Sequence, residues 1–280
     1  MIRLPEEACK ENTPLSTRFG GLEPDLVQSL AKGLAAIEAF DVEHPRMTLS
    51  EVARRIGVTP GSAQRILRTL DRLGYVGCAD GHYSLRPRTL QLGYSYLASL
   101  PAVAIAQPLL TATTGATGET AYVAVLDGMD VVYVARATGR HLRRDYMSVG
   151  TRMPAHATSP GKVLLAGMPH GDRRAMLAGR KLQRLTPCTV TDVEELLRQI
   201  AMVAERGYAL NDQETIMGLR SLAVPVTVGG RVVAALGTST EVSRNSVSEM
   251  EAHFLPRLRE TAVSLAQALK ARDADSLQGR

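Results

Sequence analysis

The chain has 280 residues, 45% of them apolar and 22% charged, a composition typical of folded globular domains that excludes a disordered or fibrous protein. Its length predicts two domains with separate cores. The formal net charge of +5 at pH 7 is modest and identifies no partner by itself. No apolar run approaches the roughly 20 residues of a membrane-spanning helix, so we expect no membrane partner.

The N-terminal residues have no features of a secretory signal, because acidic residues and prolines stand where an apolar core would be. We therefore expect residues 1–24 to be a disordered leader and the protein to be cytoplasmic. The cysteines Cys9, Cys78 and Cys188 lie far apart, with no CxxC pair and no histidine cluster. This spacing argues against disulfides and zinc, and the sequence predicts no metal and no cofactor.

Residues 25–88 begin with the pattern of a helix-turn-helix. Leucines at helical spacing predict an amphipathic helix over 25–40. Thr48 and Glu51 have the spacing of a capping box, which starts a second helix. Gly57 ends that helix, because glycine adopts the left-handed conformation of a helix terminus at little cost.

A third helix and a small hairpin complete this domain. Thr59 caps the helix, Pro60 occupies its first position, and its apolar stripe runs to Leu73. Strands over 75–78 and 82–85 flank an Ala-Asp-Gly turn, which predicts a β-hairpin, or wing. The whole segment is therefore predicted to be a winged helix-turn-helix.

The third helix carries arginines and small residues on the side opposite its apolar stripe, whereas a merely solvated face mixes both charge signs. Guanidinium groups reach phosphates and bond guanine in a major groove, so this is the pattern of a recognition helix. A structural or protein-binding winged helix is the alternative, since this geometry alone does not prove contact with nucleic acid. The predicted DNA-binding residues are Arg54, Arg55, Thr59, Ser62, Gln64, Arg65, Arg68, Thr69, Arg72 and His82.

The rest of the chain predicts a linker and an α+β domain with an antiparallel sheet. Residues 89–102 predict a linker helix, and Pro101 opens another helix that we expect to end near Thr113. Alternating residues then predict two β-hairpins, over 120–137 and 221–240.

Helices are predicted between and after these hairpins, over 160–167, 172–178, 193–206 and 246–271. Thr191 and Glu194 are expected to form a capping box for the helix over 193–206, which Gly207 ends. The α+β domain is predicted over 103–272, with a tail over 273–280.

Ser159, Pro160 and Gly161 open a helix with a hydroxyl cap, a proline and a glycine. Free backbone N–H groups and the helix dipole at such an end suit a carboxylate, so we expect an acid to bind there. An ordinary capped helix that turns Val163 and Leu164 inward explains the same residues and stays open as the alternative.

Enzyme activity is not predicted. His156, Ser159 and Lys162 lie close in sequence, but there is no G-x-S-x-G elbow, no orienting acid and no phosphate-binding loop. The acidic residues of turns, such as Asp127 and Glu214, lack the spacing of a metal-binding loop.

Three stretches, in this order, resemble IclR-type transcriptional regulators: AFDVEHPRMTLSEVAR, MPAHATSPGKVLLAG and LNDQETIMGLRSLAVPV. The resemblance extends from Asp25 to about Leu269. It is greatest to the subgroup of PcaR, PcaU and PobR types, which controls aromatic-acid catabolism through the β-ketoadipate pathway. It implies a winged helix-turn-helix, a linker helix and a GAF-like effector domain, in a homodimer or homotetramer that binds double-stranded operator DNA.

The resemblance also implies an effector pocket built around the helix start at Ser159, the loop before it and the last strands. The effector implied is a small aromatic acid, such as protocatechuate or 4-hydroxybenzoate, or a β-ketoadipate-like dicarboxylic acid. Gly237 stands where some members have serine, so we expect a larger pocket with one hydrogen bond fewer. The matching positions are Tyr146, Met153, Ser159, Pro160, Gly161, Asn211, Ser221 and Ser239.

Gly61, Gln64 and the loop HLRRDYMSVG depart from the family's pattern, which leaves the operator sequence and the effector open. The sign of regulation is open as well. The alternative function is a small-molecule-binding sensory protein or enzyme whose winged helix contacts other proteins.

Overall fold

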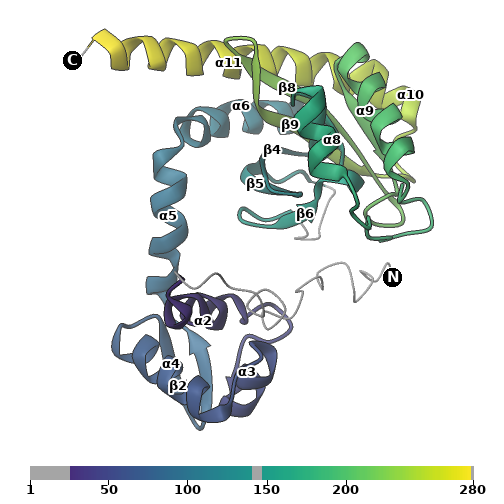
Figure 1. The fold of residues 1–280 in the computed structure, drawn as a ribbon. Helices are drawn as coiled ribbons and strands as arrows, with labels where there is room; N and C mark the ends of the chain where they lie inside the picture. Colours follow the sequence, from purple (N-terminus) through teal and green to yellow (C-terminus); the bar gives the residue numbers. More distant parts are fainter. Residues whose placement is uncertain (1–25, 141–146, 279–280) are drawn as a thin grey trace. The chain divides into compact units, whose positions relative to one another are not determined.

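The structure is a computed structural model that describes residues 26–140 and 147–278 (Figure 1). The described chain divides into two units, one ending at Leu97 and the other beginning at Ala98. The leader predicted over 1–24 lies outside the described residues. Within those residues, no single helix has the length and apolarity needed to cross a membrane, although the bent pair Pro87–Ser99 and Ala102–Thr117 meets that standard by length and composition.

The N-terminal unit places three helices against a small antiparallel sheet of order β1-β3-β2, which confirms the winged helix-turn-helix. The short strand β1 was not predicted, because a two-residue strand has no periodicity to detect. Its helices and strands are α2 (Gln28–Glu38), β1 (Met47–Thr48), α3 (Leu49–Arg55), α4 (Pro60–Arg72), β2 (Val76–Ala79) and β3 (His82–Leu85). Helix α5 (Leu90–Ser99) follows them and includes the boundary between the two units in the chain.

The predicted helix caps of this unit are confirmed. The Thr48 hydroxyl accepts from the Glu51 N–H at 3.4 Å, and the Glu51 carboxylate accepts from the Thr48 N–H at 2.7 Å. Gly57 has φ 67°, in the left-handed region. The Thr59 hydroxyl accepts from the Ser62 N–H at 3.3 Å. The two helices of the motif are therefore defined by contacts within a few residues.

The C-terminal unit is built on a six-stranded antiparallel sheet of order β6-β5-β4-β9-β8-β7. The two predicted hairpins, β4–β5 and β8–β9, are joined by pairing of β4 with β9. The edge strands β6 and β7 were not predicted, because runs this short carry little periodicity. The strands are β4 (Thr120–Asp127), β5 (Asp130–Ala137), β6 (Arg152–Pro154), β7 (Ala209–Asp212), β8 (Leu219–Val228) and β9 (Arg231–Glu241).

Helices cover both faces of this sheet (Figure 1). Helices α6 and α11 lie on one face, and α7 and α9 lie on the other, where a large cluster of buried apolar side chains gathers. The α+β class is thereby confirmed. The helices are α6 (Pro101–Thr117), α7 (Ser159–Ala166), α8 (His170–Leu177), α9 (Val193–Arg206), α10 (Val247–Glu249), a π-helical turn (Met250–Phe254) and α11 (Leu255–Gln278).

Several predicted helix ends were wrong. The capping box of Thr191 and Glu194 does not form: the cap of α9 is Asp192, whose carboxylate accepts from the Glu195 N–H at 2.8 Å. The Thr191 hydroxyl instead accepts from Arg184 at 2.9 Å. Helix α11 continues to Gln278, because no glycine or proline interrupts residues 257–278.

Helix α7 lies against the 3₁₀ turn Ala155–Ala157 at the position of Gly161. A Cβ at Gly161 would lie 2.1 Å from the Ala155 carbonyl oxygen and 2.4 Å from its Cα. Both are backbone atoms, so neither can rotate away. Only glycine therefore allows α7 to approach the turn this closely.

We predict that Gly161→Ala lowers the free energy of unfolding by about 2 kcal/mol or more, through this overlap. Gly171→Ala is the matched control, because a Cβ there meets no atom within 4 Å. It should leave stability unchanged or raise it by up to about 1 kcal/mol. Chemical denaturation measures both; equal effects of the two substitutions would contradict the close approach.

Candidate nucleic-acid interface and ligand pocket

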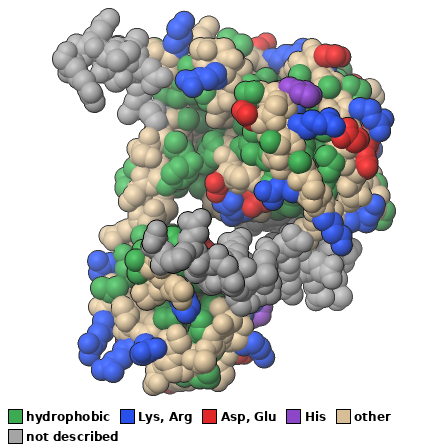
Figure 2. Space-filling view, in the orientation of Figure 1, with side chains coloured by type: hydrophobic (Ala, Val, Ile, Leu, Met, Phe, Trp, Pro, Cys, Tyr) green, Lys and Arg blue, Asp and Glu red, His purple; other side chains and the backbone are tan. Residues whose placement is uncertain are grey.

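The outer face of α4 is exposed and basic. Arg65 and Arg68 are both exposed, and neither guanidinium group has a hydrogen-bond or ion-pair partner among the described residues. Asp71, the acidic residue of this helix, is paired with Arg86 at 3.2 Å. Figure 2 shows Lys and Arg side chains gathered over the part of this unit where α4 lies. The arrangement leaves two free guanidinium groups side by side in one turn of the helix.

The other predicted DNA-binding residues differ in availability. Arg55 is held by Asp41 at 2.5 Å and by the His44 ring at 2.8 Å, so it is less free to reach a phosphate. The hydroxyls of Thr59 and Thr69 are used within α4, as N-cap and in a bond to the Arg65 carbonyl. Ser62 is half-buried, and the remaining members of the set, Arg54, Gln64, Arg72 and His82, are exposed.

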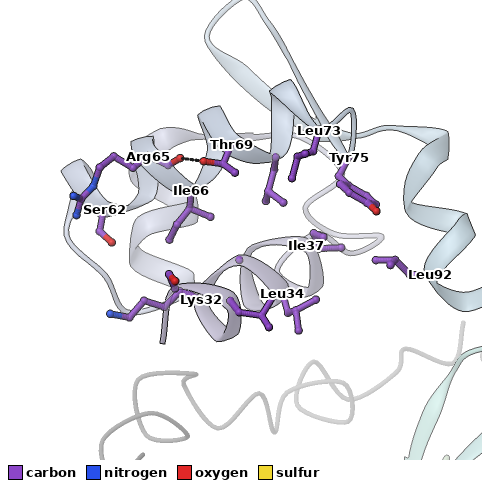
Figure 3. A pocket seen from close by; sticks show the side chains of 14 residues that line it. Lys32, Leu34, Ile37, Ser62, Arg65, Ile66, Thr69, Leu73, Tyr75 and Leu92 are labelled. Atoms are coloured by element: carbon purple, nitrogen blue, oxygen red, sulfur yellow. Dashed lines mark hydrogen bonds between the residues drawn. The ribbon is translucent and has the colours of Figure 1, made fainter. Parts of the chain in front are cut away.

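An apolar groove of about 840 Å³ lies beside this face, between α2 and α4 (Figure 3). Leu30 and Leu34 of α2 line it and are 62% and 47% exposed, and Leu73, predicted to face the core, is 49% exposed. Ser62 and Arg65 line the same groove, at the end opposite Leu92 in Figure 3. The N-terminal unit thus presents a basic face and an apolar groove next to one another.

The C-terminal unit encloses a small cavity of about 20 Å³ under α7. Asn211, Ser221 and Ser239 lie opposite one another on β7, β8 and β9 and form a polar row across the sheet. None of the described residues that line the cavity is Lys, Arg, Asp or Glu. The lining residues are Tyr133, Met147, Met153, Thr158, Asn211, Thr215, Ile216, Leu219, Ser221 and Ser239.

The sequence-predicted effector residues are distributed around this cavity. Met153, Asn211, Ser221 and Ser239 line it, whereas Pro160 and Gly161 are buried in α7 without lining it. Ser159 is not among the lining residues, but its hydroxyl lies 2.8 Å from the hydroxyl of Ser221, which lines the cavity. Tyr146 lies outside the described residues.

Two predictions about the start of α7 were wrong. The cap is Thr158, whose hydroxyl accepts from the Gly161 N–H at 3.1 Å; Ser159 is the first helical residue. Because Thr158 takes that N–H and Pro160 has none, fewer N–H groups are free for an anion than we expected.

Gly237 does not enlarge the cavity, contrary to the expectation from its lack of a side chain. A Cβ there would lie 2.7 Å from the Leu222 carbonyl oxygen and 2.8 Å from the hydroxyl and the ring of Tyr122. Tyr122 is fully buried and occupies the space, with its hydroxyl 3.5 Å from that of Ser159. Glycine at this position therefore makes room for the Tyr122 ring.

The loop between β7 and β8 is tied to α7 by a buried ion pair. The Lys162 ammonium donates to Glu214 at 2.5 Å and to Gln199 at 2.8 Å. Burial lowers the pKa of Lys162, and the adjacent Glu214 carboxylate acts in the opposite direction. Glu214 is followed by Thr215 and Ile216, which line the cavity. The pair thus holds one wall of the cavity in place.

His156 and Ser159 do not form a catalytic pair. The His156 Nε2–H donates to the Gln183 carbonyl at 2.9 Å, while the Ser159 hydroxyl is hydrogen-bonded to Ser221. Burial lowers the pKa of His156, so its ring is neutral at pH 7. No cluster of three or more His, Cys, Asp or Glu in the described part of the chain is arranged to hold a metal.

Sequence reasoning missed several residues that line the cavity. Tyr133 lies on a predicted strand, but its sheet face and its neighbours depend on how the two hairpins pair. Thr158 and Thr215 lie within two of the stretches that carry the family resemblance, but only the fold shows that they face the cavity. The missed residues are Tyr133, Met147, Thr158, Thr215, Ile216 and Leu219.

Two family descriptions match the chain: the IclR helix-turn-helix domain over residues 29–77 and the bacterial transcriptional regulator IclR C-terminal domain over residues 94–267. The chain belongs to the IclR family. It is therefore a DNA-binding transcriptional regulator and not an enzyme.

Relatives of known role share most of the chain's length. The Pca regulon regulatory protein of Pseudomonas putida is 40% identical, over 88% of this chain and 86% of that protein. The p-hydroxybenzoate hydroxylase transcriptional activator of Acinetobacter baylyi is 36% identical, over 86% and 91%. An IclR homolog from Microbacterium hydrocarbonoxydans, solved with 4-hydroxybenzoate, is 29% identical with a TM-score of 0.74, over 87% of this chain and 99% of that one.

We predict that Lys162→Met lowers the free energy of unfolding by about 3–5 kcal/mol, because it leaves the Glu214 carboxylate buried without its cation. The double variant Lys162→Met with Glu214→Leu should recover most of that loss, since an apolar pair replaces both charges.

Arg174→Met is the matched control, because its pair with Glu194 is exposed and should contribute less than about 1 kcal/mol. Urea denaturation measures all three variants. A double variant no more stable than Lys162→Met would contradict the view that the unpaired carboxylate causes the loss.

Proposed function

We propose that this IclR-family regulator binds operator DNA through α4 and controls the catabolism of aromatic acids. The observation that carries the DNA part is the pair Arg65 and Arg68, exposed and without partners among the described residues on a helix whose caps fix its start. Free guanidinium groups on the exposed face of a helix-turn-helix can enter a major groove and bond phosphates or guanine. Within the unit, we assign DNA binding to residues 25–88 and the linker helix to residues 89–102.

The proposed effector is a small organic acid bound in the domain over 103–272, in the cavity under α7. Candidates are protocatechuate, 4-hydroxybenzoate and a β-ketoadipate-like dicarboxylic acid. Support comes from the relatives that regulate pca genes or p-hydroxybenzoate hydroxylase, and from the homolog solved with 4-hydroxybenzoate. The polar row of Asn211, Ser221 and Ser239 makes one wall of this cavity polar.

Binding requires this cavity to widen. It measures about 20 Å³, whereas a cavity of about 150 Å³ is needed to hold a benzene ring. Met147 and Met153 line it, and unbranched methionine side chains can change rotamer at low cost. An effector that binds only the conformation with the wider cavity shifts the protein toward that conformation. This shift gives the effector a means to alter the affinity for DNA.

We further propose that the regulator acts in the cytoplasm as a homodimer or homotetramer. The apolar groove between α2 and α4 supports self-association, because exposed leucines of this kind are commonly covered by a partner. The same groove favours the second candidate function, in which the winged helix contacts another protein instead of DNA.

We predict that Arg65→Ala combined with Arg68→Ala weakens binding to the DNA upstream of the protein's own gene by about 30-fold or more, as each of the two lost contacts costs about 1–3 kcal/mol. The dependence of affinity on salt should also fall, by about one unit of slope for each phosphate contact removed. Fluorescence anisotropy at several salt concentrations measures both.

Arg198→Ala is the matched control, since Arg198 is an exposed arginine of the C-terminal unit paired with Glu195. This variant should bind the same DNA with the affinity of the unchanged protein. If the double variant also binds as tightly, the helix-turn-helix serves protein contacts and the proposal is wrong.

We predict that 4-hydroxybenzoate or protocatechuate changes the affinity for that DNA by about 5- to 150-fold, a coupling of about 1–3 kcal/mol. By reciprocity, the DNA should change the affinity for the acid by the same factor. Anisotropy titrations with and without each acid measure the first effect, and calorimetry measures the second. An unchanged DNA affinity with every acid tested would exclude these effectors.

A further inference from the structure

Tyr133 is an almost fully buried tyrosine whose hydroxyl has no hydrogen-bond partner among the described residues. Its side chain is 3% exposed, it lines the cavity under α7, and it makes no side-chain hydrogen bond to any described residue. Two other tyrosines differ: the Tyr122 hydroxyl has Ser159, and the Tyr208 hydroxyl donates to Glu251 at 2.6 Å. Buried hydroxyls are nearly always hydrogen-bonded, so this one is a candidate for a bond to a guest.

The Tyr133 ring is held in place by its neighbours. It meets the ring of Tyr122 edge to face, with centroids 5.0 Å apart and planes at 84°. Tyr122 is itself fixed beside Gly237, where no side chain displaces it. Ring packing alone therefore fixes the position of the Tyr133 hydroxyl, with no hydrogen bond to an acceptor among the described residues.

The other polar groups of the lining are already engaged. The Thr158 hydroxyl caps α7, the Asn211 amide bonds the Ala157 carbonyl and accepts from the Glu214 N–H, and the Thr215 hydroxyl donates to Ala157. Burial holds the pKa of Tyr133 well above its usual value, so the phenol keeps its proton and acts as a donor.

We propose that Tyr133 is a specificity-determining residue that donates a hydrogen bond to the carboxylate of the effector. The inference rests on the proposed function, which supplies the acid. An ionised carboxylate only accepts hydrogen bonds, and the Tyr133 hydroxyl is a donor that has no acceptor among the described residues. The two groups are therefore complementary. Thr158, at the N-terminus of α7, lines the same small cavity, so the positive end of the helix dipole lies on the side where the charge would sit.

Tyr133→Phe tests the proposal, because it removes only the unbonded oxygen. We expect calorimetry to show about 10- to 100-fold weaker binding of 4-hydroxybenzoate, the range for a lost hydrogen bond to a charged group. The melting temperature should stay the same or rise, since the oxygen bonds nothing in the described protein. Tyr208→Phe is the matched control, which loses a hydrogen bond outside the cavity and should bind the acid unchanged.

Benzoate and adipate decide which atom of the ligand is contacted. If Tyr133 donates to the carboxylate, Tyr133→Phe should weaken both by the same factor as 4-hydroxybenzoate. A loss confined to 4-hydroxybenzoate would assign the contact to the ring hydroxyl and overturn the proposal, as would full affinity of Tyr133→Phe for all three acids. If the unchanged protein binds none of these acids or protocatechuate, the proposed effector class fails, and the role of Tyr133 fails with it.

Discussion

The pairing of β4 with β9 is the contact on which the C-terminal unit depends. It joins two hairpins that are more than 80 residues apart in the chain and sets Thr120 opposite Ser239 and Tyr122 opposite Gly237. This register brings the Tyr122 ring beside the hydroxyl groups under α7, and the β4–β5 hairpin places the Tyr133 ring beside Tyr122. A shift of one residue would turn every one of these side chains to the opposite face of the sheet. The cavity is therefore a product of long-range pairing and not of any single motif.

Features determined by residues close in sequence could be predicted, whereas features that depend on the pairing of distant strands could not. The capping box of Thr48 and Glu51, the Thr59 cap and both hairpins are each determined within a few residues, and all of them were found. The cap of α9 was placed one residue early, because Thr191 and Asp192 can each accept from an N–H three residues ahead. Of the cavity, the polar row was reached through family resemblance, whereas Tyr133 was missed because its surroundings come from strands β4 and β9.

The two units present contrasting chemistry. The N-terminal unit has an exposed cationic face and an open apolar groove, both suited to large partners. The C-terminal unit has a small, uncharged, nearly closed cavity, held on one side by the ion pair of Lys162 and Glu214. A buried ion pair beside the cavity costs energy compared with apolar residues of similar volume, and removal of either partner would leave a buried charge next to the loop between β7 and β8.

The fit between Gly237 and the Tyr122 ring has an evolutionary consequence. Any side chain at position 237 collides with the tyrosine, and a smaller residue at position 122 leaves a void against the glycine. Neither position can change freely while the other stays the same. Regulators of this fold that keep a large ring at position 122 should therefore keep glycine at position 237, and loss of the ring alone should not free that position, because the Leu222 carbonyl oxygen also lies 2.7 Å from the added Cβ.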